Sequence, residues 1–127
     1  MRKFDRYECN IPVNIYCDCD REGVEVINGY AVNISRQGCN VKFDKHCDAL
    51  QPGRGVTVEL RMDFCNISFT GIVRHIDTND VGIQLICFPD NHQHEMFDIV
   101  MTNIERGENI ELYNVVHSNS FCEKIEL

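Results

Sequence analysis

Hydrophobic and polar residues alternate along most of the first 87 positions, with the two-residue period of half-buried β-strands. The clearest case is residues 7 to 17, where apolar residues take every second position and Glu, Asn or Pro stand between most of them. Short strands at regular spacing, separated by turn residues, are typical of a small antiparallel barrel. We therefore predict an all-β, six-stranded antiparallel barrel. Its strands fall within residues 7–17, 24–34, 39–43, 56–64, 67–76 and 81–87.

The period changes from two to helical spacing after Pro89. Asp90 or Asn91 can serve as the N-cap of a helix, and Gly107 can end it. The predicted helix should lay its apolar stripe on the barrel. This stripe consists of Met96, Phe97, Val100, Met101 and Ile104. We expect residues 1–106 to form one domain and residues 107–127 an acidic tail. The sequence leaves open whether this tail is an extended strand, a second short helix or a partner-binding segment.

Length and composition agree with one globular domain. The chain has 127 residues, of which 43% are hydrophobic. No apolar run approaches the roughly 18–20 residues that a membrane span needs, so we expect no membrane insertion. No apolar segment follows the basic residues at the N-terminus, and we therefore expect no signal peptide and a cytoplasmic location.

The charge is unevenly distributed. The formal net charge is −8, which argues against a general DNA- or RNA-binding protein, because such affinity rests on neutralising phosphates. Residues 90–127 contain eight acidic and two basic residues, a net charge of −6, so residues 1–89 carry only −2. The body of the chain can therefore hold a local anion site, whereas the tail cannot.

The chain contains eight cysteines, a large number for its length. Without a secretory context they do not indicate disulfides. Four of them fall on the apolar phase of their strands, where a thiol behaves as a small hydrophobic group. These are Cys9, Cys17, Cys39 and Cys87. We interpret the cysteines as reduced.

A zinc site is the sharpest competing use of the thiols. It would combine Cys17 and Cys19 with Cys47, His46 or the pair His92 and His94. Structural zinc sites commonly show two cysteines separated by two to four residues, or two histidines separated by three to five, and neither spacing occurs here. We expect no metal and no cofactor.

No catalytic motif is present. The chain lacks GxSxG, HExxH and a phosphate-binding loop, and it has no convincing pair of carboxylates. The many thiols leave a Cys–His nucleophile open, although no pattern singles one out. We expect that the protein is not an enzyme.

Two polar clusters are candidates for a binding site. In the strand that ends near Ser35, alternation places Asn33 and Ser35 together, on the face opposite Tyr30, Val32 and Ile34. An amide and a hydroxyl at a strand end can donate and accept hydrogen bonds. Near the N-terminus, two arginines stand four residues apart in the segment Arg2-Lys3-Phe4-Asp5-Arg6.

Together these clusters resemble the PilZ domain family. Asn33-Ile34-Ser35-Arg36-Gln37-Gly38 matches its [D/N]xSxxG motif, and the segment from Arg2 to Arg6 matches its RxxxR motif. Their order fits as well, as does the later strand that ends in Gly82-Ile83-Gln84-Leu85. The resemblance covers residues 2 to 106. It implies a split β-barrel of six strands that serves as a bacterial receptor for the second messenger cyclic di-GMP.

The resemblance also implies which residues bind the ligand. Arg2, Arg6, Asn33, Ser35 and Gly38 match the two motifs. Guanidinium groups can bind phosphate oxygens and the O6/N7 edge of guanine, both of which cyclic di-GMP offers twice. Many family members have Asp at the position of Asn33. Asn keeps an acceptor oxygen there and adds an N–H donor.

Two further arginines stand outside the fixed positions of the two motifs. Arg36, inside the second motif, is either a solvated charge or a phosphate contact. Arg74, on a later strand, is a similar candidate outside the motifs.

Two functions remain open at this stage. The first is a cyclic di-GMP receptor whose N-terminal arm changes on binding and which signals to an unidentified protein effector. The arm, residues 1 to 6, contains Phe4 as its only apolar anchor apart from the first methionine. The alternative is a PilZ-like adaptor that binds no nucleotide and acts by protein contact, for example in pilus or motility machinery.

Overall fold

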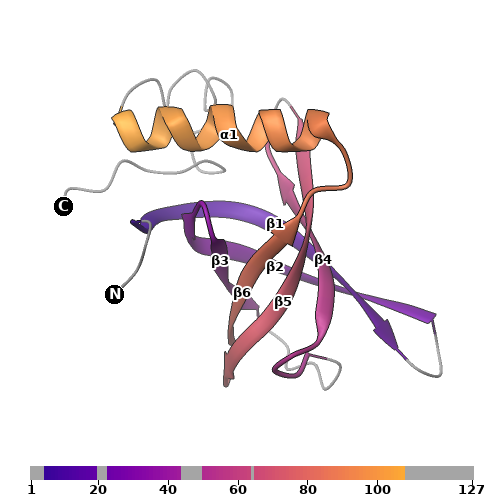
Figure 1. Ribbon diagram of the computed structural model, residues 1–127. Coiled ribbons are helices and arrows are strands. Elements are labelled where there is room, and N and C mark those ends of the chain that lie inside the picture. The colour runs from indigo at the N-terminus through magenta and orange to yellow at the C-terminus, as the bar shows by residue number, and fades with distance from the viewer. Residues whose placement is uncertain (1–4, 20–22, 44–49, 64, 108–127) are drawn as a thin grey trace.

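The computed structural model describes residues 5–19, 23–43, 50–63 and 65–107. In this part of the chain six antiparallel strands form a closed barrel, and one helix lies across one end of it (Figure 1). The order around the barrel is β1-β2-β3-β6-β5-β4. The elements are β1 (Tyr7–Cys19), β2 (Gly23–Ser35), β3 (Gly38–Phe43), β4 (Gly55–Arg61), β5 (Asn66–Asp77), β6 (Asp80–Cys87) and α1 (Asn91–Arg106). The prediction of an all-β barrel followed by a helix is confirmed, whereas the tail from residue 108 lies outside the described residues.

The barrel interior is filled by the apolar positions of the alternating strands. In β1, Ile11, Val13 and Ile15 are fully buried, and Val58 in β4 and Phe69 in β5 meet them in the same core. Each such side chain stabilises the fold by roughly 1.5–3 kcal/mol through its removal from water. The strands are held in one register because a shift by one residue would turn this apolar set toward the solvent.

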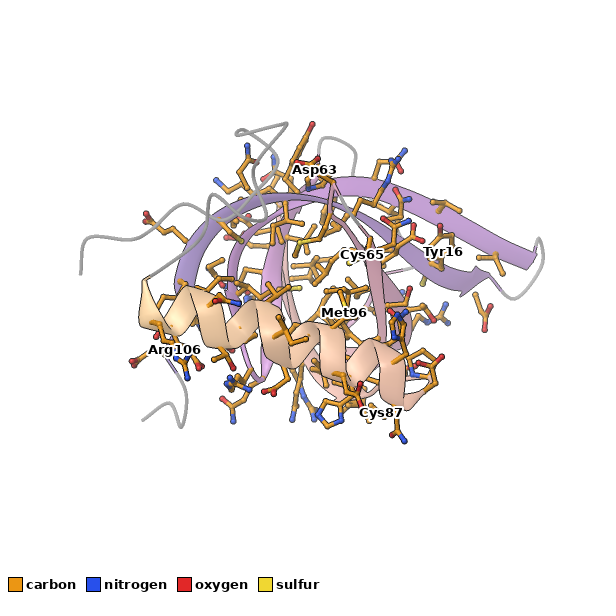
Figure 2. All side chains as sticks on the ribbon, turned by 90° about the horizontal axis from the view of Figure 1, so that it is seen from above. Tyr16, Asp63, Cys65, Cys87, Met96 and Arg106 are labelled. Atoms are coloured by element: carbon orange, nitrogen blue, oxygen red, sulfur yellow. The ribbon has the colours of Figure 1, made fainter. Side chains whose placement is uncertain are left out.

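Helix α1 begins and ends where the sequence predicts. The side chain of Asp90 accepts a hydrogen bond from the backbone N–H of Gln93 at 2.9 Å, and Gly107 adopts the left-handed conformation that ends the helix. The apolar stripe faces the barrel, with Met96 packed against the core (Figure 2). Helix α1 therefore covers one end of the barrel.

Within the described residues, no helix is long and apolar enough to cross a membrane.

The phase of β2 differs from the prediction. Tyr30 was expected to share a face with Val32 and Ile34, but it is 51% exposed, while its neighbour Ala31 is fully buried. The pairing of β2 with β3 shifts register between Ala31 and Asn33, which is a β-bulge. A bulge adds one residue to one strand and so reverses which face the following side chains take.

Two smaller expectations are also wrong. Asn28 and Gly29 were interpreted as a turn or a bulge, but β2 runs through them, and Gly29 pairs with Phe43. A Cβ on Gly29 would lie 2.4 Å from the carbonyl oxygen of Lys42, so the close approach of β3 accounts for this glycine. Cys87 was placed on the apolar phase, but it is exposed, because the pairing of β6 with β5 shifts register next to it.

Strand β6 leaves no room for a side chain at Gly38 of β3. Its backbone has φ near +148°, and a Cβ there would lie 1.9 Å from the carbonyl oxygen of Ile83. No side chain larger than hydrogen fits without moving the backbone of β6. Gly38 therefore fixes the point at which the chain turns from β2 into β3 against β6.

Replacing Gly38 with alanine is expected to lower the free energy of unfolding by roughly 2–3 kcal/mol, because the added Cβ overpacks against backbone. Urea denaturation measures the loss. Gly55→Ala is the matched control, since the nearest atom to its Cβ is 3.9 Å away, and its effect should stay within about 0.5 kcal/mol. Equal losses in both variants would contradict the close approach.

Burial also predicts how two cysteines react. Cys39 is 6% exposed, and burial raises the pKa of its thiol, whereas Cys87 at the end of β6 is exposed. Because the thiolate is the reactive form, N-ethylmaleimide should label Cys87 long before Cys39 at pH 7, and Cys39 should stay slow up to pH 9. Mass spectrometry of the labelled peptides gives the order. Equal rates in the native protein, rather than only in denaturant, would show that Cys39 is accessible.

Candidate functional site

A cavity of about 210 Å³ lies where the end of β2, the following turn, β3, β5 and β6 meet the root of the N-terminal arm. Most of its lining residues are polar or glycine, in contrast to the apolar barrel interior. They are Arg6, Asn33, Ser35, Gln37, Gly38, Cys39, Asn40, Arg74, His75, Gly82, Ile83 and Gln84. The structure therefore brings together five of the seven predicted site residues, namely Arg6, Asn33, Ser35, Gly38 and Arg74. Arg2 lies outside the described residues.

Two β-bulges lie beside the polar side chains of the cavity. The register shift in β2 falls just before Asn33, so that this residue lines the cavity although Ala31, two positions earlier, faces the core. A second shift, between Val73 and His75 in the pairing of β5 with β6, falls at Arg74. Bulges re-aim side chains in this way, and they are common beside binding sites.

The turn between β2 and β3 is held by its own hydrogen bonds. The hydroxyl of Ser35, which is buried, accepts a hydrogen bond from the backbone N–H of Gln37 at 3.0 Å. The carbonyl oxygen of Gln37 accepts one from the N–H of Leu85 in β6 at 2.7 Å. Ser35 thus shapes the turn, in addition to lining the cavity, and still has a hydroxyl proton to donate.

The cavity is cationic in an acidic protein. Its lining includes the guanidinium groups of Arg6 and Arg74, and no aspartate or glutamate among the described residues. Arg6 is exposed, and Nε of Arg74 donates a hydrogen bond to Oε1 of Gln84. This bond orients the guanidinium and leaves its terminal N–H groups for a ligand. The arrangement suits an anion that also offers acceptors to planar donor groups.

Several cavity residues were missed by the sequence analysis. Asn40 and Gln84 occupy polar positions between apolar neighbours in β3 and β6, so alternation offered a signal for both. His75 gave no such signal. Its ring lies over Gly82, where an added Cβ would come within 2.0 Å of the imidazole.

The cavity is smaller than the roughly 300–1,000 Å³ of a typical small-molecule pocket. It can therefore enclose only a part of a large ligand, such as one base or the phosphates. The remainder of such a ligand would lie over the mouth of the cavity, where Arg6 is exposed.

Arg36 does not line the cavity, although it belongs to the same turn. Its guanidinium forms ion pairs with Asp98 and Glu105 of α1 and also donates a hydrogen bond to Thr102. The hydrogen bonds to Glu105, and to a smaller extent the one to Asp98, raise the pKa of Arg36 above its ordinary, already high value. Neither of the two predicted roles, a solvated charge or a phosphate contact, describes this side chain in the structure.

Tyr7 connects the root of the arm to the same charges. It follows Arg6 directly and pairs with Ile34 of β2. Burial raises the pKa of its phenol, and the carboxylates of Asp5 and Glu105 add to this effect, while Arg36 opposes it. The arm root, the turn and the helix therefore share one electrostatic environment.

Metal ligands do not cluster in the described part of the chain. It contains no group of three or more His, Cys, Asp or Glu side chains that could hold a metal ion. The zinc alternative involves His46 and Cys47, which lie outside the described residues. Among the described cysteines, Cys9, Cys17, Cys39, Cys65 and Cys87 are not joined in disulfides.

Solved structures similar to this chain share its fold. The PilZ domain of CeSA from a cellulose-synthesizing bacterium is 15% identical, with a TM-score of 0.62 over 80% of this chain and 98% of that chain. The PilZ domain of YcgR from Escherichia coli, solved with c-di-GMP, is 13% identical, with a TM-score of 0.62 over 83% and 92%. MrkH of K. pneumonia, solved as a c-di-GMP complex, is 13% identical, with a TM-score of 0.64, and this chain covers 54% of it.

The family assignment rests on the sequence. A search of curated proteins finds no matching relative. The family model of the PilZ domain matches residues 1–102, which is most of the 127-residue chain and includes both motifs and the whole barrel. The chain therefore belongs to the PilZ domain family.

Proposed function

We propose that this protein is a receptor for cyclic di-GMP and that the ligand binds in the cationic cavity. The observation that carries the proposal is that Arg6 lines the same cavity as Asn33, Ser35 and Gly38, although it is remote from them in sequence. Arg74 lines this cavity as well. Two relatives of the same fold, YcgR and MrkH, were solved with c-di-GMP.

The chemistry of the lining matches the ligand. A guanidinium can hold two phosphate oxygens or the O6/N7 edge of guanine with a pair of parallel hydrogen bonds. The amide of Asn33 can donate and accept hydrogen bonds at a base edge. Because no carboxylate lines the described cavity, the negative charge of a phosphate meets no like charge there.

Replacing Arg6 with alanine is expected to weaken the binding of cyclic di-GMP by roughly a hundredfold or more. Each charge-assisted hydrogen bond contributes about 1.5–3 kcal/mol, and the variant loses two. Isothermal titration of both proteins measures the change.

Arg61→Ala is the matched control for this titration. Arg61 is an exposed arginine at the end of β4 that does not line the cavity, so its loss removes the same charge without a contact. Titration with cyclic di-AMP, which carries the same phosphates but has no O6 on its bases, tests whether the site recognises guanine. If the unmodified protein gives no heat and no competition at high concentrations of cyclic di-GMP, the receptor function is wrong, and the non-binding adaptor is favoured.

The proposal includes a change in the N-terminal arm. Arg6 is exposed at the mouth of the cavity and next to Tyr7, the first residue of β1. The ligand phosphates would supply partners for Arg6 and for Arg2, so that residues 1 to 6 close over the nucleotide. A protein effector would then recognise the new surface formed by the arm and ligand.

Hydrogen exchange with and without cyclic di-GMP is expected to show slower exchange in residues 2 to 8 when ligand is bound, because the arm gains fixed partners. Strand β4, which contributes no residue to the cavity, is the internal control and should not change. If residues 2 to 8 exchange equally in both states while titration shows binding, the arm is not the element that reports the ligand.

A further inference from the structure

The side chain of Arg36 attaches the turn between β2 and β3 to helix α1. Its Nε and Nη2 donate hydrogen bonds to the two carboxylate oxygens of Glu105, at 2.7 and 2.9 Å. Nη2 also donates to the hydroxyl of Thr102 at 3.0 Å, and Nη1 donates to Asp98. The three acceptors are spaced by four and three residues, which places them on one face of the helix.

This contact is stronger than an ordinary surface ion pair. Isolated exposed pairs contribute little to stability, because they are screened and must order two side chains. Here the pairing with Glu105 is bidentate, the side chain of Arg36 is only 26% exposed, and a second carboxylate and a hydroxyl share the same guanidinium. A planar fork with several fixed acceptors loses little freedom for each bond that it forms.

The contact restrains the turn more than it restrains the helix. The helix is already anchored by four buried side chains: Phe97, Val100, Met101 and Ile104. The turn, in contrast, has no large apolar side chain between Ser35 and Gly38 to anchor it, and Gln37 at its centre is exposed. Loss of Arg36 should therefore loosen the turn and leave α1 folded on the barrel.

The same turn supplies residues to the cavity on its other side. Ser35, Gln37 and Gly38 line the cavity, and the carbonyl oxygen of Gln37 accepts the hydrogen bond from Leu85. Arg36 lies among these residues but is directed to the helix. Any displacement of the turn relative to α1 thus changes the geometry of the cavity lining.

We propose that Arg36 is a positioning residue for the nucleotide cavity. By holding the Ser35–Gly38 turn against α1, it keeps Gln37 and Gly38 in the arrangement that binds ligand, without touching the ligand itself. The part of this inference that concerns affinity rests on the proposed function. By thermodynamic linkage, a ligand that fixes the turn also strengthens its attachment to α1.

A rival role makes the opposite prediction for the helix carboxylates. If Arg36 left the helix and contacted a phosphate directly, Asp98 and Glu105 would compete with the ligand for it. Neutralising these acids would then free Arg36 and tighten binding. If Arg36 acts by positioning, neutralising them loosens the turn and weakens binding.

The test compares Arg36→Gln, the double variant Asp98→Asn with Glu105→Gln, and the variant that combines all three changes. Titration with cyclic di-GMP should show both the single and the double variant weakened by roughly five- to tenfold. The combined variant should be no weaker than either, because all of them break the same contact. Tighter or unchanged binding in the double variant, or unchanged binding in Arg36→Gln, overturns the proposal.

Glu95→Gln is the matched control for charge. Glu95 is an exposed acid on the same helix and forms none of the contacts with Arg36. Its change measures how much the loss of a negative charge alone strengthens the binding of an anion, and it should alter affinity by less than about twofold, since exposed charges are screened. A weakening equal to that of the double variant would overturn the specific role of Arg36.

A second measurement needs no ligand and separates this inference from the proposed function. Amide exchange followed by NMR should be faster at Gln37 and Leu85, whose N–H groups bond within and to the turn, in Arg36→Gln and in the double variant. It should be unchanged there in Glu95→Gln, and α1 should stay protected in all variants. If the unmodified protein binds no nucleotide, the receptor proposal fails, and this exchange still decides whether Arg36 holds the turn against α1. Unchanged exchange at both amides overturns that role.

Discussion

The approach of β3 to β6 at Gly38 is the contact on which the barrel core and the cavity both depend. There the backbone lies so near the carbonyl oxygen of Ile83 that only hydrogen fits in the position of a side chain. The approach closes the barrel over its apolar residues and brings Asn40 and Gln84 into one polar wall. The turn that precedes Gly38 carries Arg36, whose guanidinium pairs with Asp98 and Glu105 of α1. The barrel wall, the cavity lining and the contact with α1 therefore meet at this one turn.

Much of the fold could be predicted because each strand has one buried face, and alternation records that face directly. The helix was equally readable from its stripe and from its caps at Asp90 and Gly107. The phase of Tyr30 was wrong because the bulge beside it arises from pairing with β3, a property of two strands that neither sequence contains alone. The same bulge explains how Ala31 can face the core and Asn33 the cavity, which strict alternation forbids.

Part of the candidate site could be predicted from its motifs, and the remainder depends on contacts distant in sequence. Asn33, Ser35 and Gly38 stand within one short segment, so the sequence places them together without the fold. His75 was missed because its ring is positioned by Gly82 on the neighbouring strand, which leaves room for it. The contact of Arg36 with α1 was missed because its partners lie 62 to 69 residues away in the sequence. No local pattern reports such a pairing.

The distribution of charge gives Arg36 a physical reason beyond geometry. A protein with a net charge of −8 repels an anionic ligand unless its acids lie away from the site or are neutralised. Asp98 and Glu105 lie on α1 and contact Arg36, which belongs to the turn that lines the cavity. Pairing with Arg36 offsets part of the charge of these two carboxylates where they stand. Arg6 and Arg74 line the cavity without an aspartate or glutamate among its described lining residues, so the positive charge of the domain is concentrated there and the nearest helix acids are paired elsewhere.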